Sequence, residues 1–170
     1  MMLSILKILI LLVIFVICTS LGLLKAKSYH NRVSELKKMK NALEVLKSKI
    51  EFTYEPIKDI FLEISKIVYH GQDNIFQETL NQIDEKGVMN SWNNAVEKNI
   101  NLSEEDKSTI KMFGKLLGKT DKAGQINEIN VTSKLIDTLI EKAEIELTKN
   151  YKLFKTLGPI VGIGICIILL

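Results

Sequence analysis

The residues that could do chemistry in this chain are few and lie far apart. The two histidines, His30 and His70, have no partner at the spacing that metal ligands require. The two cysteines, Cys18 and Cys166, both lie inside uncharged apolar stretches, where a thiol acts as a small apolar side chain. The sequence therefore predicts neither a metal site nor a disulfide framework.

Motifs for phosphate binding and nucleophilic catalysis are also missing. Gly162 and Gly164 lie in an apolar stretch, and Gly114-Lys115 lacks the spacing of a Walker loop. No histidine stands near a candidate nucleophile, and the acidic residues alternate with lysines as on a solvated helix face. We therefore predict a protein that is not an enzyme, with no catalytic residue, no cofactor and no metal ligand.

Charge is distributed unevenly along the 170 residues: residues 8–24 and 156–170 carry none. Four of the 23 basic residues (Lys7, Lys25, Lys27 and Lys155) lie outside residues 28–153, which leaves 19 there against all 20 acidic residues. A near-neutral segment with a single arginine lacks the basic face that phosphate backbones need, so no nucleic acid is expected as a partner.

Both uncharged stretches have the length of membrane anchors. Residues 8–24 would extend about 26 Å as a helix, and with residues 3–6 added they predict a transmembrane anchor over 3–24. The second stretch, counted from residue 154, reaches about 25 Å, which is marginal for spanning, and predicts a transmembrane segment over 154–170. A buried core helix is the alternative for this second stretch, but it has no polar face.

Basic residues at the inner edges of both anchors predict the orientation. They are Lys25, Lys27, Arg32, Lys37, Lys38 and Lys40 after the first anchor, and Lys142, Lys149, Lys152 and Lys155 before the second. Because such residues are retained on the cytoplasmic side, we expect a cytoplasmic helical domain over residues 28–153. The alternative is a signal peptide that is removed, which would make the protein an exported one.

Small residues in the two anchors predict that the anchors pack together. Gly158 and Gly162 have the small-xxx-small spacing, and they could approach Ser20 and Gly22 of the first anchor. Pro159 offers another explanation of the same pattern, as a kink in the second anchor.

The charged segment is predicted to be helical throughout, because its apolar residues recur every three or four positions. The expected helices cover residues 28–53, 56–70, 74–87, 88–99, 103–118 and 121–157. Their predicted caps are Asp73 or Asn74, Ser103, and Thr120 or Asp121, with Gly87 and Gly118 as helix ends and Trp92 in the core. The fold class is thus all-α, a six-helix cytoplasmic bundle flanked by transmembrane helices.

The order of these parts resembles the stage III sporulation protein AB family of endospore-forming bacteria. The resemblance rests on the first anchor, the Ala42-Leu43-x-x-Leu46-x-x-x-Ile50 pattern, Pro56, mid-chain Trp92, Phe113-Gly114-x-x-Leu117-Gly118-x-x-Asp121, and Tyr151-x-x-x-Lys155-x-Leu157-Gly158. Lys49 and Phe52-Thr53 depart from it, because the family usually has an acid at the first position and a tyrosine-glycine pair at the second.

This resemblance implies a cytoplasmic domain similar to those of the type II secretion F protein and the type IV pilus platform protein. It also implies a place in the mother-cell membrane around the forespore, within a channel that joins the two cells. The implied partners are the ATPase of the family, stage III sporulation protein AA, and other channel components. The implied function is therefore a scaffold that couples the ATPase to the membrane apparatus.

Residues 114–121 are the predicted partner-binding loop, since loops on a rigid bundle often carry contacts. The candidate residues are Gly114, Gly118, Lys119, Thr120 and Asp121. The alternative is that Gly118 and Asp121 only cap helices. A second hypothesis for the whole protein is a membrane-tethered helical protein that forms homo-oligomers and has no ATPase partner.

Overall fold

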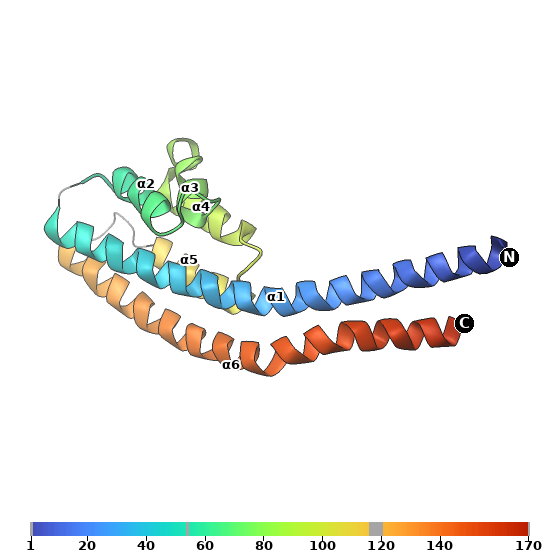
Figure 1. Ribbon diagram of the computed structural model, residues 1–170. Helices are drawn as coiled ribbons and strands as arrows, with labels where there is room; N and C mark the ends of the chain where they lie inside the picture. The colour runs from blue at the N-terminus through green and yellow to red at the C-terminus, as the bar shows by residue number, and fades with distance from the viewer. Residues whose placement is uncertain (1, 54, 116–120, 170) are drawn as a thin grey trace. The chain divides into compact units, whose positions relative to one another are not determined.

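The computed structural model describes residues 2–53, 55–115 and 121–169, and in this part of the chain all regular structure is α-helical. The helices are α1 (Met2–Phe52), α2 (Ile57–Ile67), α3 (Ile75–Leu80), α4 (Ile83–Lys98), α5 (Glu104–Gly114) and α6 (Lys122–Leu169) (Figure 1). The predicted all-α fold, with long apolar helices at both ends, is confirmed.

The chain forms two compact units. The terminal unit contains residues 1–33 and 142–170, and the central unit contains residues 34–141. The predicted boundaries at 3–24, 28–153 and 154–170 followed the uncharged stretches alone, and they stay a prediction. The observed terminal unit also includes charged helical turns beyond those stretches.

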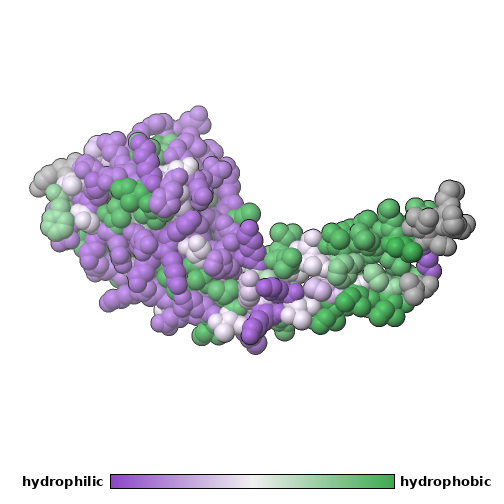
Figure 2. Space-filling view, viewed as in Figure 1, coloured by the Kyte–Doolittle hydropathy of each residue, from purple (hydrophilic) through white to green (hydrophobic). Residues whose placement is uncertain are grey.

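The terminal unit consists of one end of α1 and one end of α6. Both helices are long and apolar enough to cross a membrane. In the most apolar 18-residue segment of each helix, only 11% is buried in α1 and only 6% in α6. The core helix of a soluble protein would bury most of this surface. The low burial of these two helices therefore fits a lipid environment better than a protein core. Figure 2 shows the apolar side chains of this unit on its surface.

The central unit packs the short helices around a core of large side chains. Helix α3 lies against α2 and α4, and α4 lies against α5 (Figure 1). Helix α1 contributes Leu36, Leu43 and Leu46 to this core, and all three are fully buried. The surface of this unit is mainly hydrophilic (Figure 2).

An aromatic cluster holds the centre of this core. The indole of Trp92 lies 5.8, 5.3 and 5.6 Å, between ring centroids, from Phe61, Phe76 and Phe113. Its Nε1 donates a hydrogen bond to the carbonyl of Ile110 at 2.9 Å, so the buried polar atom is satisfied. Trp92 is 0% exposed, and the prediction that it belongs to the core is confirmed.

The helix ends follow local chemistry. Ser103 caps α5 in a capping box with Asp106, and Asn74 rather than Asp73 caps α3. The expected helix over 74–87 is wrong in its extent, because α3 ends at Leu80 and α4 begins at Ile83. At Gly87 the backbone leaves the helical region, with a φ of 72° and a ψ of 164°, so α4 is broken there into residues 83–86 and 88–98. The predicted helix end at Gly87 therefore coincides with this break.

Candidate functional site

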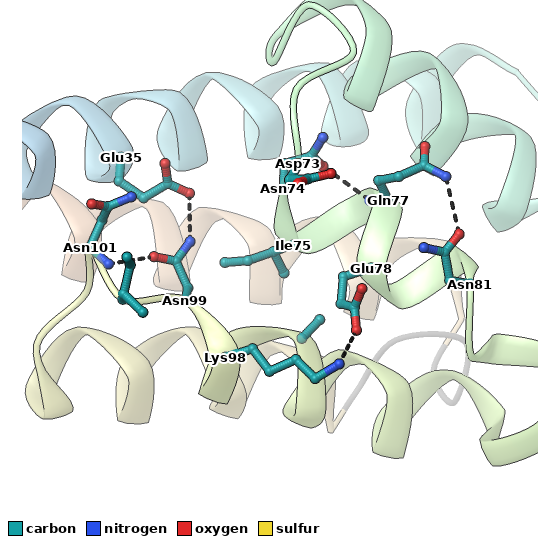
Figure 3. Close-up of a pocket in the computed structure, with 12 residues that line it drawn as sticks. Glu35, Asp73, Asn74, Ile75, Gln77, Glu78, Asn81, Lys98, Asn99 and Asn101 are labelled. Carbon is teal, nitrogen blue, oxygen red and sulfur yellow. Dashed lines mark hydrogen bonds and ion pairs between the residues drawn. The ribbon is translucent and has the colours of Figure 1, made fainter.

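The central unit has a polar pocket of about 350 Å³ near its α3–α4 corner (Figure 3). Glu35 enters it from α1, Gln77 and Glu78 from α3, and Lys98 from the end of α4. Asparagine side chains supply much of the remaining lining: Asn74, Asn81, Asn99 and Asn101. The pocket therefore offers many hydrogen-bond donors and acceptors within a small volume.

Glu35 is the buried acid of this pocket, with only 8% of its surface exposed. Burial raises the pKa of its carboxyl, while a hydrogen bond from Asn99 and the positive charge of Lys38 oppose the rise. The Nδ2 of Asn99 donates to Oε1 of Glu35 at 3.0 Å (Figure 3). Within the described part of the chain, this hydrogen bond from Asn99 holds the carboxylate in the pocket.

Tyr69 is a second buried titratable residue of the central unit and is 1% exposed. Burial raises the pKa of its phenol well above the usual value, and the charge of Glu35 adds to the rise. Among the described residues its hydroxyl has no hydrogen-bond partner. The ammonium of Lys38 lies 5.5 Å from the centroid of its ring. Glu35 and Tyr69 are therefore coupled electrostatically, although no hydrogen bond joins them in the described part of the chain.

Asn74 fixes the wall that α3 contributes. Its Oδ1 accepts from the backbone nitrogen of Gln77 at 3.0 Å, as an N-cap does. Its Nδ2 donates to Ser65 Oγ at 2.9 Å and to the carbonyl of Gln72 at 2.6 Å. These bonds join α2, the turn after it and the start of α3, so this wall is rigid.

The outer rim combines polar pairs with one apolar side chain. Lys98 forms an ion pair with Glu78, and Asn99 Oδ1 accepts from the backbone nitrogen of Asn101 at 2.9 Å (Figure 3). Between these two asparagines Ile100 is 94% exposed. Ile100 is thus an exposed apolar side chain on an otherwise polar rim.

The described residues contain no group of three or more His, Cys, Asp or Glu side chains that could hold a metal ion. The expectation of no cofactor and no metal stays a prediction.

Sequence reasoning missed this pocket. Glu35 had a detectable signal: it lies four residues before Met39 and seven before Ala42, so it shares a face with two buried residues. Asn99 and Ile100 had no such signal in the sequence, because they lie in a turn, where the spacing of apolar residues predicts no position in the fold. Only the fold brings them to α1.

The predicted partner-binding loop is described only at its edges. Gly114 is buried, and a Cβ on it would lie 2.2 Å from Cδ1 of Trp92. Asp121 is exposed, and its Oδ1 accepts from the backbone nitrogen of Gly124 at 3.0 Å, as a helix cap does. Gly118, Lys119 and Thr120 lie outside the described residues. The structure therefore describes only two of the five candidates, and the partner-binding loop stays a prediction.

The small residues of the terminal unit lie where α1 and α6 approach most closely. An ideal Cβ on Gly22 would lie 2.8 Å from the Cα of Gly158, and one on Gly158 would lie 2.9 Å from the carbonyl oxygen of Cys18. A Cβ on Gly162 would lie 3.0 Å from the ring of Phe15.

Ser20, the remaining candidate of this set, is exposed. Thr19 lies in its place against Gly158, whose ideal Cβ would be 3.3 Å from the Cα of Thr19. The structure therefore brings three of the four small residues to the contact between α1 and α6, and leaves the fourth outside it.

Comparison with known proteins places this architecture in a family. Residues 7–170 match the family described as stage III sporulation protein AB (spore_III_AB). The stage III sporulation protein AB of Bacillus subtilis (strain 168) is 25% identical over 162 residues, which cover 92% of this chain and 95% of that protein. No solved structure matches significantly. Because the family match covers nearly the whole length, this chain belongs to the stage III sporulation protein AB family.

Proposed function

We propose that this sporulation protein is a membrane scaffold that docks a cytoplasmic ATPase to a channel between mother cell and forespore. The family match from residue 7 to residue 170 carries the proposal, because it includes both apolar helices and the domain between them. The ATPase would be the family partner implied by the resemblance, stage III sporulation protein AA. The membrane would be that of the mother cell around the forespore.

The basic residues near both apolar stretches support a cytoplasmic central unit. Lys25 and Lys27 follow the first stretch, and Lys152 and Lys155 precede the second. Retention of such residues on the inner side would give the central unit access to a nucleotide-driven partner. A docking scaffold needs no catalytic group of its own.

The polar pocket with Ile100 is the surface we assign to the ATPase. Ile100 is 94% exposed beside amide groups that could pair with backbone atoms of a partner. Burying such a side chain in a complex would contribute about 1.5–3 kcal/mol. The wall behind it is fixed by the hydrogen bonds of Asn74.

A pull-down of the full chain in detergent against the purified ATPase tests this assignment. We expect Ile100→Glu to weaken binding by about tenfold or more. Phe52→Glu is the matched control, because Phe52 is another highly exposed apolar side chain of the central unit, at 77%. Equal losses of ATPase binding in both variants would contradict the assignment of the pocket as the docking surface. If the wild type does not bind the ATPase, the proposed partner is wrong.

The loop at residues 114–121 remains a second proposed contact. Reversing two of its charges with Lys119→Glu and Asp121→Lys leaves the net charge unchanged. The same pull-down reports whether this double variant loses the ATPase, with Ser108→Ala as a neutral control on exposed α5 surface. If sporulation fails while the protein still assembles in the membrane, ATPase coupling is favoured over a purely structural role.

Oligomerisation without an ATPase is the alternative function. One observation favours it: Val131 and Leu135 lie one turn apart on α6 and are 45% and 43% exposed. A second copy could cover this apolar pair. The mass of the purified chain in detergent, measured by light scattering, decides whether copies associate when no ATPase is present.

A further inference from the structure

The terminal unit contains a groove that the proposed docking does not use. It lies between α1 and α6 and has a volume of about 680 Å³. Part of its lining is apolar: Leu23 and Ala26 from α1, with Leu147 and the ring of Tyr151 from α6. Ala26 is 2% exposed, so its small side chain forms the floor of the groove.

Basic side chains complete the lining. Lys27 and His30 come from α1 and Lys152 comes from α6, and no acidic residue lines the groove among the described residues. Neither lysine forms an ion pair with a carboxylate in the described part of the chain. The nearby carboxylate of Glu146 is already paired with Arg32 at 2.7 Å. An occupant that carries negative charge would therefore find free cations above an apolar floor.

The groove also lies at the right depth for a lipid headgroup. Lys27 follows Leu23 by four residues, about 6 Å along α1, and Leu23 is near the end of the uncharged stretch. The headgroup layer on one side of a bilayer is about 5–8 Å thick. On α6, Tyr151 precedes the second uncharged stretch by a similar length. The stacking of Tyr29 on Phe154, with centroids 5.9 Å apart, closes the helix pair at this level.

We propose that this groove binds one anionic phospholipid of the surrounding leaflet. Its phosphate lies between Lys27 and Lys152, and one acyl chain lies over Leu23 and Ala26. Attraction of anionic headgroups to basic residues near a membrane supplies the selectivity. Leu23 and Tyr151 are 46% and 39% exposed in this lining, which favours a lipid over a free phosphate, because a phosphate would leave both side chains in contact with water. The proposal rests on the membrane location in the proposed function, but it is independent of the ATPase.

The test uses the full chain in phosphatidylcholine vesicles with spin-labelled phosphatidylglycerol or spin-labelled phosphatidylcholine. The fraction of immobilised lipid is measured by electron paramagnetic resonance. We expect the wild type to prefer phosphatidylglycerol, and the double variant Lys27→Gln/Lys152→Gln to lose roughly tenfold of that preference.

The matched control is Lys25→Gln/Lys155→Gln. It removes the same charge within one helical turn of the groove lysines, but Lys25 and Lys155 do not line the groove. Their ammonium groups lie 5.6 and 5.9 Å from the ring centroids of Tyr29 and Tyr151. We expect this control to lose less of the lipid preference than the groove variant, because its lysines contribute only diffuse surface charge. Equal losses in the two double variants would mean diffuse surface charge rather than a site, and would overturn the proposal.

A third variant tests the apolar part. Thr148 also lines the groove, and Thr148→Trp fills it without changing the charge. We expect this variant to lose the immobilised lipid although both lysines remain. Inorganic phosphate at millimolar concentration is not expected to displace the immobilised lipid. Displacement would show that the groove binds anions in general, and would contradict the lipid site.

Resistance to carbonate extraction separates the two proposals. A wild-type chain that carbonate releases from membranes contradicts both the proposed function and the lipid site. A chain that stays in the membrane but shows no lipid preference contradicts the lipid site alone.

Discussion

At the scale of single residues, Gly114 and Trp92 make a contact that leaves no room for a side chain. A Cβ on Gly114 would lie 2.2 Å from Cδ1 of the indole. The indole has little room to shift, because its Nε1 donates a hydrogen bond to the carbonyl of Ile110 and aromatic rings pack around it. We expect Gly114→Ala to lower the free energy of unfolding by about 1–3 kcal/mol. Denaturant unfolding of the full chain, followed by the fluorescence of its single tryptophan, measures this.

The control for this substitution is Gly164→Ala. Nothing lies within 4 Å of a Cβ at Gly164, which is also inside a helix. Gly164→Ala adds the same methyl group where it meets no atom, so a loss of stability seen only in Gly114→Ala reports the contact with Trp92. Equal stability of the two variants would contradict the packing described for Gly114.

Glu35 makes the stability of the central unit depend on pH. Because its pKa is raised in the folded state, the folded chain binds the proton more tightly than the unfolded chain does. Stability therefore falls as the pH rises from the ordinary value near 4.5 through the raised value. We expect Glu35→Gln to be more stable than the wild type at neutral pH, with the difference shrinking toward pH 4.5. Thermal unfolding at a series of pH values measures it.

Asn99→Ala tests the cause of this dependence. The hydrogen bond from Asn99 lowers the pKa of Glu35, so its removal should raise that pKa further. The loss of stability should then extend to a higher pH than in the wild type. An unchanged pH profile in Asn99→Ala would mean that the bond does not form in solution.

At the scale of elements, the sequence predicted some helix ends well and others badly. The start of α5 was predictable because Ser103 and the acids after it carry their own capping chemistry. The division between α3 and α4 was not, because Ile83 continues the apolar spacing of Ile75, Phe76 and Leu80. Only the tertiary packing decides which helix a residue on that spacing joins.

The contact between the ends of α1 and α6 can be tested by a new disulfide. An ideal Cβ at Gly162 would lie 3.3 Å from Cβ of Cys18, near the separation that a disulfide spans. We expect Gly162→Cys, combined with Cys166→Ser, to form an internal disulfide on mild oxidation. Mass spectrometry after blocking of the remaining thiols measures the loss of two hydrogens.

Gly164→Cys in the same background is the control. No atom of α1 lies within 4 Å of a Cβ at Gly164, so its thiol should stay free. If both variants cross-link equally, or if neither does, the packing of these two helices differs from the one described here.

At the scale of the whole molecule, the sequence predicted the class of fold and the two apolar ends, because both depend on periodicity and charge alone. The pocket could not be predicted, since it joins residues as distant as Glu35, Asn74 and Asn99. Its formation depends on how α3 and α4 pack, and no local pattern specifies that. The lipid groove likewise needs two helices from opposite ends of the chain.

The orientation of the central unit decides whether a cytoplasmic ATPase can reach it. We expect a cysteine at Ser108, an exposed position on α5, to be protected from a membrane-impermeant maleimide in intact cells. The chain for this test carries Cys18→Ala and Cys166→Ala, so that only the new thiol can react. The basic residues around both apolar stretches are the physical reason for the expected protection.

Labelling after the cells are permeabilised is the control, because it shows that the thiol at position 108 is reactive. Labelling in intact cells would place the central unit outside and would make a cytoplasmic ATPase an impossible partner. In that case the mass of the mature chain would distinguish two remaining topologies. Loss of about 2 kDa would indicate a removed signal peptide. An intact mass would instead indicate that both anchors are retained and that the lysines at their inner edges lie outside the cell, contrary to the usual orientation.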